Sequence, residues 1–328
     1  PGQHKMTRWR PAAGAAAARS RASMLRRIRD YFDNADVLEV DTPALSPYAV
    51  SDTQIESFSI PVSAVSPAPL FLNTSPEFCM KRLLAAGYPD IFSVCRVFRD
   101  GECGRRHQPE FTMIEWYRLG FDLRDIVADT VAVIRAALPA EKCAADPVTI
   151  DYRDCFLQTL DVDPLTADID ELARIANADT DLQRSIGAHR DDWLDLVLAT
   201  RIAPAFAADR LTVLQHYPAS QAALARLCPD DPRVADRFEV FLGPVELANG
   251  YVELTDATEQ SRRMQQDNAA RRQRNREVRP RDTSLLAALE AGLPDCAGVA
   301  MGLERLQMIH DNTDDIGDVL TFSFEAHE

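Results

Sequence analysis

Residues 91–119 read IFSVCRVFRDGECGRRHQPEFTMIEWYRL, and this stretch decides the fold. Residues 91–98 and 110–119 are apolar runs with the length and the aromatic and β-branched content of strands. The segment between them is polar and holds two glycines, which predicts a long-looped antiparallel hairpin. The sequence contains neither a G-x-x-x-x-G-K-[ST] loop nor a G-x-G-x-x-G loop, so any nucleotide is held in another way.

Outside this hairpin, strands and helices follow one another without regular βαβ winding. Apolar periodicity predicts helices at 20–34, 78–86, 122–138, 191–208, 255–277 and 284–291. Composition and turn residues predict strands at 37–40, 55–60, 69–77, 211–218 and 238–254, and a strand at 296–302 that runs into a helix. Most strands are joined as antiparallel hairpins, with a turn at Gly243-Pro244 in the 238–254 pair. We therefore predict an α+β fold, an antiparallel sheet flanked by helices.

The chain shows no internal repeat and no obvious linker, which favours one domain rather than two. We predict a mobile N-terminal tail over residues 1–18, because this stretch is rich in alanine and lacks the apolar core of a secretory signal. Residues 19–328 are then predicted to form a single domain.

Composition excludes several classes of protein. Lys and Arg number 36 and Asp and Glu 51, which gives a net charge of −15 and disfavours a general nucleic-acid-coating role. Apolar runs are too short for a membrane-spanning helix, which needs about 20 residues. The seven cysteines are scattered and form no Cys-x-x-Cys pair, so we expect reduced thiols and a cytoplasmic location.

The loop 99–109 is the most densely charged part of the hairpin. It holds Arg99, Arg105, Arg106 and His107, and an arginine-rich hairpin loop can clamp a phosphate with paired hydrogen bonds. The alternative is a solvated loop with surface ion pairs. In the strand that follows, alternation places Phe111, Met113, Glu115 and Tyr117 on one face. A carboxylate beside a phenol suits an ammonium group, unless this face is exposed to solvent.

Two further segments carry candidate chemistry. Glu246 and Glu253 lie seven residues apart, which in an uninterrupted strand means opposite faces, but Asn249-Gly250 could form a turn or bulge that re-aims them. Two carboxylates near a polyphosphate suit Mg²⁺, and exposed acids beside a turn are the alternative. Arg305 is predicted in the first turn of a helix, where a cation opposes the helix dipole. Either it has a function or it pairs with an acid such as Glu304.

Taken together, these segments resemble the class II aminoacyl-tRNA synthetases, in their lysyl branch. Residues 98–118 resemble motif 2 of that family, GVAMGLER (298–305) resembles motif 3, and helix 20–34 with VLEVDTP (37–43) resembles motif 1, which ends at Pro43. The segments TSPEFCMKRLL (74–84) and ELANGYVELTDA (246–257) are also similar to the lysyl type. The resemblance covers about residues 15–325 and puts motif 1 at about 20–43, motif 2 at about 91–119 and motif 3 at about 298–310.

Two features narrow the resemblance. Motif 1 begins near residue 20, so we expect that the N-terminal anticodon-binding barrel of the lysyl enzymes is absent. The chain also has Ser75-Pro76-Glu77 where those enzymes usually have Ala-Pro-Glu, and Ala300 where they have glycine. Both changes resemble the truncated paralogues of the lysyl branch, ligases that activate (R)-β-lysine with ATP and attach it to a lysine ε-amine of elongation factor P.

The resemblance implies a role for each matching residue. It gives catalytic roles to Arg99 on the α-phosphate of ATP, to Arg305 on the γ-phosphate and to Glu246 on Mg²⁺. Phe111 would stack on adenine, and the other nucleotide contacts would come from Asp100, Gly101, Glu102, His107, Gln108, Leu247 and Gly302. Glu246 and Glu253 would hold Mg²⁺. The (R)-β-lysine site would comprise Ser75, Pro76, Glu77, Glu115, Tyr117, Asn249, Glu253 and Ala300. The chain departs from the family at Gly101, where relatives often have glutamate and Glu102 follows one place later, and at Gln108, where they commonly have asparagine.

The resemblance also implies a homodimer that uses the apolar stripe of helix 20–34, and no stable binding of tRNA or DNA and no membrane association. The eight arginines of 262–281 are interpreted either as a dock for elongation factor P or as a solvated helical face. Two other functions remain open: a non-catalytic synthetase paralogue that acts as a binding or regulatory subunit, and residual aminoacylation of tRNA. Such non-catalytic paralogues usually lose the phosphate-binding arginines, and this chain has Arg99 and Arg305.

Overall fold

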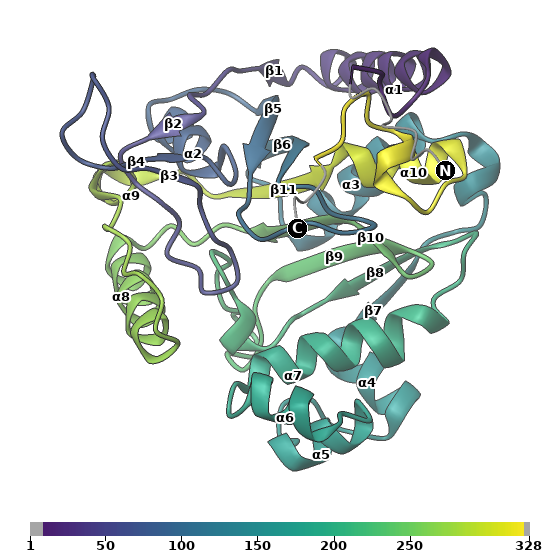
Figure 1. Ribbon diagram of the computed structural model, residues 1–328, viewed down its shortest axis with the longest axis vertical. Helices are drawn as coiled ribbons and strands as arrows, with labels where there is room; N and C mark the ends of the chain where they lie inside the picture. Colours follow the sequence, from purple (N-terminus) through teal and green to yellow (C-terminus); the bar gives the residue numbers. More distant parts are fainter. Residues whose placement is uncertain (1–8, 325–328) are drawn as a thin grey trace, which may run out of the picture.

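An eight-stranded sheet lies at the centre of the computed structural model, which describes residues 9–324 (Figure 1). Its strands, in spatial order, are β1 (Leu38–Glu39), β5 (Ile91–Phe98), β6 (Glu110–Leu119), β11 (Cys296–Gly302), β10 (Val245–Val252), β9 (Arg237–Leu242), β8 (Leu211–Gln215) and β7 (Val148–Asp151). The strands from β5 to β8 pair antiparallel, whereas β1 and β7 are parallel to their neighbours at the two edges. The predicted α+β fold around an antiparallel sheet is confirmed.

A small second sheet has the order β2 (Leu45–Ser46), β4 (Leu70–Leu72) and β3 (Ser59–Ile60). The helices are α1 (Ala15–Asn34), α2 (Glu77–Ala85), α3 (Leu123–Ala137), α4 (Tyr152–Leu160), α5 (Ile169–Ile175), α6 (Thr180–Ile186), α7 (Arg190–Val197), α8 (Ala257–Gln273), α9 (Thr283–Gly292) and α10 (Leu303–Asp311). Several begin at an aspartate that caps the first turn, as Asp122 does for α3 and Asp256 for α8.

One face of the large sheet is covered by α1, α3 and α10, and this is where the main core lies (Figure 1). Phe32 of α1 stacks on Phe92 of β5, with ring centroids 4.4 Å apart, and also contacts Trp116 of β6. The apolar residues of this core alternate along β6 with the polar residues that face the other way. The packed face therefore fixes the strands whose opposite face forms the candidate site.

The other helices gather in two groups. Helices α2 and α9 share a second core cluster with Met264 of α8, beside β5, β6 and β11. Helices α4, α5 and α7 pack around Trp193 and Phe156 in a third cluster, which reaches the sheet through Leu214 and Phe241. Figure 1 shows α4–α7 below the sheet and α8 and α9 to one side. Both groups border the face of the sheet that α1, α3 and α10 leave uncovered.

The N-terminal boundary differs from the prediction. Helix α1 begins at Ala15 rather than Ser20, and the backbone N–H groups of Ala12 and Ala13 donate to the carbonyls of Thr321 and Leu320. These hydrogen bonds hold residues 12–18, which the sequence placed in a mobile tail, against the C-terminal segment. Residues 1–8 of that predicted tail lie outside the described residues.

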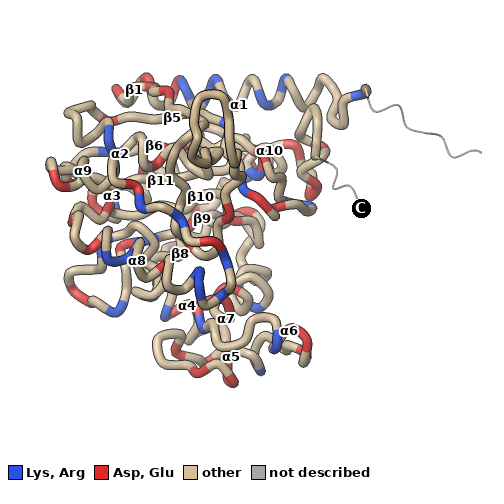
Figure 2. The backbone as a smooth tube through the Cα atoms, turned by 60° about the vertical axis from the view of Figure 1, so that its left-hand side comes forward, with Lys and Arg blue, Asp and Glu red and all other residues tan. Residues whose placement is uncertain are grey.

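The apolar stripe of α1 was predicted to face a second subunit, and this is wrong. Met24, Ile28 and Phe32 are fully buried in the core of their own chain. Figure 2 shows basic residues along the rest of α1. The apolar stripe of this helix is therefore not available to a second subunit.

Three smaller differences concern the secondary structure. The predicted helix 191–208 is regular over Arg190–Val197 and continues as short irregular turns to Ala205. Strand β7, which pairs with β8 at the sheet edge, has no counterpart among the predicted strands. Among the described residues, none of the helices combines the length and the apolarity needed to cross a membrane.

Candidate active site

A cavity of about 1130 Å³ opens on the uncovered face of the sheet. Strands β6, β9, β10 and β11 contribute its floor, and loop 51–57, α2 and α7 contribute its walls. Two cross-strand rows supply the side chains of the floor. The register aligns Glu115, Ala300, Asn249 and Glu239 in one row, and Tyr117, Gly298, Tyr251 and Arg237 in the next. Residues from four separate stretches of sequence therefore meet on one surface.

One end of the cavity is a buried cluster of charges centred on Lys81 of α2. The Lys81 ammonium lies 2.6 Å from Glu77 Oε1 and 2.5 Å from Glu253 Oε2, and its side chain is 2% exposed. The hydroxyl of Tyr251 donates to Glu77 Oε1 at 2.8 Å. Burial alone would lower the pKa of Lys81, but the carboxylates of Glu253 and Glu77 raise it, so this lysine stays charged.

A third carboxylate, Glu115, completes this cluster. The hydroxyl of Tyr117 donates to Glu115 Oε1 at 2.7 Å, and the hydroxyl of Ser75 donates to Glu115 Oε2 at 2.8 Å. Burial and the nearby charge of Glu77 raise the pKa of Glu115 to about 8. Glu115 is therefore largely protonated near neutral pH while no cation is bound beside it.

These groups are unbalanced in charge. Three carboxyl groups, from Glu77, Glu115 and Glu253, surround one ammonium, that of Lys81. When all three are ionised the cluster carries two uncompensated negative charges in a buried setting, where charges must be paired. The Oδ1 atom of Asn249, which also faces the cavity, has no hydrogen-bond partner among the described residues. A ligand with two ammonium groups matches this set of acceptors.

Gly298 makes room for the cluster. A β-carbon at this position would overlap Glu253 Oε1 and would lie 2.5 Å from the ring of Tyr117. Gly298, in the predicted motif 3, therefore leaves the space that the carboxylate of Glu253 and the ring of Tyr117 occupy over the strand.

The other end of the cavity carries guanidinium groups, beginning with Arg99 at the end of β5. Its Nε lies 3.4 Å from the carbonyl of Thr74, its guanidinium lies 5.2 Å from the centre of the Phe111 ring, and Glu102 is 3.7 Å away. These contacts hold Arg99 on the wall of the cavity. Gly101 has a φ of +81°, which explains why a glycine follows Asp100 at this turn.

Arg305, in the first turn of α10, brings two further predicted residues together. One of its nitrogens lies 3.1 Å from Glu246 Oε2, and the other lies 2.6 Å from His107 Nε2. Partial burial and the charge of Arg305 lower the pKa of His107, which keeps the imidazole neutral and able to accept. Arg305, Glu246 and His107 come from three different segments, so the structure assembles this part of the predicted site.

The predicted metal pair, in contrast, is not assembled. A bulge does re-aim strand β10, but it lies at Leu247 rather than at Asn249-Gly250. Glu246 and Glu253 consequently both line the cavity. Seven residues of extended strand still separate their Cα atoms by roughly 20 Å, too far for one ion. Glu253 belongs to the Lys81 cluster.

A different carboxylate faces Glu246. Glu239, on the neighbouring strand β9, lies in the same cavity, and burial together with the charge of Glu246 raises its pKa to about 7. Arg237 pairs with Glu239 at 2.7 Å. Two carboxylates that repel each other in this way are suited to a divalent cation.

The remaining predicted nucleotide residues take other positions. The side chain of Leu247 is buried in the main core, so its main chain alone could meet a nucleotide. Gln108 is buried and accepts a hydrogen bond from the backbone N–H of Phe324. The cavity walls include Ser75, Pro76 and Ala300, whereas Asp100, Gly101, Glu102, Gln108, Phe111 and Gly302 are not part of them.

Lys81, Tyr251 and Glu239 are site residues that the sequence analysis missed. Glu77 and Lys81 have the i, i+4 spacing of a helical ion pair, and Tyr251 alternates with Asn249 and Glu253 along one strand, so both carried a signal. Glu239 carried no such signal in the sequence, because its position beside Glu246 depends on the pairing of β9 with β10.

Comparison with known proteins agrees with this geometry. The chain matches the family model described as tRNA synthetases class II (D, K and N) over residues 3–326. The chain therefore belongs to the class II tRNA synthetase family.

Its relatives include ligases that carry a more specific name. A protein of Pseudoalteromonas translucida (strain TAC 125), named elongation factor P–(R)-β-lysine ligase, is 42% identical over 322 residues, which cover 96% of this chain and 97% of the relative. A protein of the same name from Klebsiella pneumoniae (strain 342) is 42% identical over 324 residues, which cover 97% of this chain and 98% of the relative.

The close approach at Gly298 yields a prediction. In Gly298→Ala, the new methyl group displaces Glu253 or Tyr117, so the Kd of the amino-acid substrate should rise roughly tenfold or more while that of ATP stays near the wild-type value. Calorimetric titration of each ligand measures this. Gly14→Ala is the control, because nothing lies within 4 Å of its added carbon. An unchanged amino-acid Kd in Gly298→Ala would contradict the assignment.

Proposed function

We propose that this chain activates (R)-β-lysine with ATP and transfers it to the ε-amine of a lysine in elongation factor P. The observation that carries the proposal is the charge imbalance around Lys81, where three buried carboxyl groups face one ammonium. (R)-β-lysine brings two ammonium groups, which offset that imbalance. The names of the relatives support the same substrate and acceptor.

The guanidinium groups in the cavity are the proposed ligands of the ATP phosphates. We assign Arg99 to the α-phosphate and Arg305 to the γ-phosphate, because both face the cavity beyond the carboxylate cluster. The present partners of Arg305, Glu246 and His107, would share it with the nucleotide. Glu239 and Glu246 fit Mg²⁺ as oxygen donors, and a bound ion supplies positive charge that offsets the charge of the leaving pyrophosphate.

The first half-reaction needs positioning more than covalent help from the protein. A carboxylate oxygen of the amino acid forms a bond to the α-phosphorus, the bond to the bridging oxygen breaks, and pyrophosphate leaves. Arg99 stabilises the charge that develops on the α-phosphate oxygens. Glu77, Glu115 and Glu253 hold the ammonium end, so the carboxylate is directed toward Arg99.

The second half-reaction transfers the activated amino acid. The neutral ε-nitrogen of the acceptor lysine bonds to the carbonyl carbon of the adenylate, the bond to the phosphate oxygen breaks, and AMP leaves. The nitrogen gives up a proton as the amide forms. The cavity has a volume of about 1130 Å³, which leaves room for a lysine side chain beside the adenylate.

The two other functions are less well supported. A non-catalytic subunit has no need for Arg99 and Arg305 at the wall of a cavity that also holds Glu239 and Glu246. Aminoacylation of tRNA requires a nucleic-acid surface, and the net charge of −15 works against one. Translation takes place in the cytoplasm, so the proposed partner places the chain there.

Pyrophosphate exchange tests the proposed function. With (R)-β-lysine, (S)-β-lysine and α-lysine supplied side by side, exchange into ATP should be stimulated most by (R)-β-lysine. The product of the full reaction with elongation factor P should show a mass increase of one β-lysyl group on one lysine. Equal stimulation by all three amino acids, or labelling of tRNA instead of the protein, would contradict the proposal.

We also propose that residues 19–328 act as one catalytic domain and that the chain forms a homodimer. Strand β1 supports the dimer, because it is the edge of the large sheet and its Leu38 is 47% exposed. Light scattering at micromolar concentration should then give twice the 36.5 kDa mass of the chain. In Leu38→Glu, the mass should fall toward that of one chain. A wild-type mass of 36.5 kDa would refute the dimer.

A further inference from the structure

The arginine-rich segment 262–281 does not form a free basic surface. Of its eight arginines, seven have a hydrogen-bond partner within the chain: Arg262, Arg263, Arg271, Arg274, Arg276, Arg279 and Arg281. Five of the seven pair with a carboxylate of the chain, which leaves fewer unpaired charges for a dock for elongation factor P: Arg262, Arg263, Arg271, Arg274 and Arg279. Three of the seven, Arg271, Arg276 and Arg279, bond to one loop, residues 51–57, which lines the active-site cavity.

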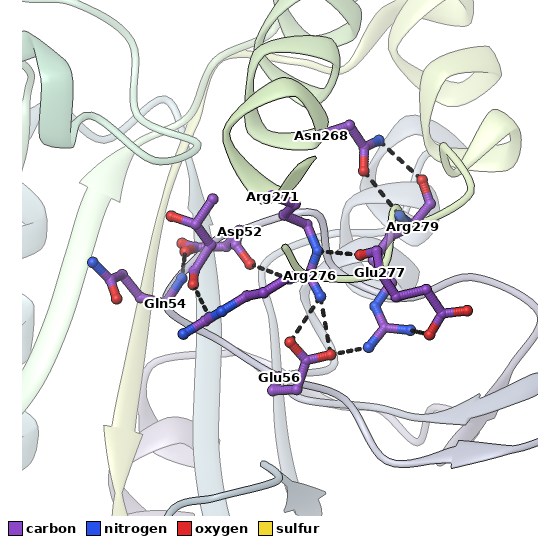
Figure 3. A network of polar contacts seen from close by, with 9 residues as sticks. Asp52, Gln54, Glu56, Asn268, Arg271, Arg276, Glu277 and Arg279 are labelled. Carbon is purple, nitrogen blue, oxygen red and sulfur yellow. Dashed lines mark hydrogen bonds and ion pairs between the residues drawn. The ribbon is translucent and has the colours of Figure 1, made fainter. Parts of the chain in front are cut away.

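Glu56 is the centre of this contact (Figure 3). Its carboxylate receives two hydrogen bonds from Arg271, at 2.9 and 2.7 Å, and a further one from Arg279. We refer to Glu56, Arg271 and Arg279 as the clasp. Arg271 is 0% exposed, so two guanidinium groups and one carboxylate share a largely buried site.

The arginines of the clasp are held firmly from their own side. Arg271 also donates to the carbonyls of Glu277 and Asp52, at 2.6 and 3.0 Å. The side-chain amide of Asn268 exchanges two hydrogen bonds with the backbone of Arg279, at 2.9 and 2.8 Å. Figure 3 shows both arginines converging from the end of α8 and the segment after it. Helix α8 and the segment after it therefore hold in place the two arginines that bind Glu56.

Glu56 in turn reaches the nucleotide end of the cavity through its main chain. Its carbonyl oxygen accepts a hydrogen bond from the backbone N–H of Asp100 at 2.8 Å. Asp100 directly follows Arg99, whose own N–H donates to the carbonyl of Pro109 at 2.9 Å. The path from α8 to Arg99 thus consists of the clasp, one peptide hydrogen bond and one covalent bond.

We propose that Glu56, Arg271 and Arg279 are positioning residues for ATP: they fix the loop that sets the place of Arg99 in the cavity. The inference rests on the proposed function in taking ATP as the ligand of Arg99. The amino-acid end does not depend on the clasp, because Glu77 and Lys81 are on α2 and Glu115 and Glu253 are on or beside the central strands. Loss of the clasp therefore affects one ligand and not the other.

The test compares Glu56→Gln with Glu277→Gln in the full chain. Glutamine in place of Glu56 leaves the buried guanidinium of Arg271 without a carboxylate and removes one of the two carboxylates that pair with Arg279, so loop 51–57 and Asp100 shift. Glu277 pairs with the same Arg279 at 2.8 Å from the solvent side, and its side chain is 72% exposed, which makes it a matched control. The Kd of ATP, without amino acid, and the Kd of (R)-β-lysine are measured for each by calorimetry, together with the melting temperature.

The expected result is selective. In Glu56→Gln, the Kd of ATP rises roughly tenfold while that of (R)-β-lysine stays within about twofold of wild type, and Glu277→Gln changes neither. Glu56→Asp keeps the charge and serves as the second variant where Glu56→Gln does not fold, with a smaller rise in the Kd of ATP. A lower melting temperature with both dissociation constants unchanged, or changed by the same factor, would overturn the proposal. Pyrophosphate exchange by the wild type separates the outcomes, because its absence counts against the proposed function and not against the clasp.

Discussion

The buried charge cluster around Lys81 is the constraint on which the rest of this structure depends. Three carboxyl groups beside one ammonium leave a buried excess of negative charge, and protonation of a carboxyl group or the arrival of a cation reduces it. The pKa of Glu115, raised to about 8 by burial and by Glu77, is the means by which the empty site limits its charge. The ammonium groups of the ligand then supply the positive charge that the cluster lacks.

Several features of the fold serve this cluster. The two cross-strand rows bring Glu115 and Asn249 to either side of Ala300, and Gly298 leaves the space that Glu253 and Tyr117 need. The core under the sheet, built on Phe32, Phe92 and Trp116, keeps these strands in register. At the other end, the clasp ties loop 51–57 to α8 and so to Arg99. The amino-acid end is held by the sheet and by α2, whereas Arg99 at the nucleotide end depends on a loop contact.

The sequence predicted the local features of this protein well. Strands β5 and β6 have the bounds that were predicted, because a run of aromatic and β-branched residues on each side of a polar loop permits few other structures. The shared face of Glu115 and Tyr117 followed from simple alternation. Arg99, Arg305 and His107 could be placed in one site because they belong to segments that resemble motifs 2 and 3 of the class II synthetases.

The failures have a common physical cause, since each depends on contacts between distant segments. The re-aiming of Glu246 was expected at Asn249-Gly250, but the extra residue is Leu247, whose burial beside Ala248 decides the register. Glu239 becomes the neighbour of Glu246 through the pairing of β9 with β10. The arginines of 262–281 were taken as a surface because nothing local marks Glu56, more than two hundred residues earlier, as their partner.

The most direct measurement of the central claim is the proton balance of ligand binding. (R)-β-lysine is titrated calorimetrically near neutral pH in buffers of different ionisation enthalpy, beside one analogue that lacks the ε-amine and one that lacks the β-amine. Because Glu115, with a pKa of about 8, is protonated before binding and loses its proton beside the new ammonium, the account predicts a release of up to one proton for each (R)-β-lysine bound. Both analogues should bind roughly tenfold more weakly or worse. Equal affinity for all three ligands, with no proton released, would contradict it.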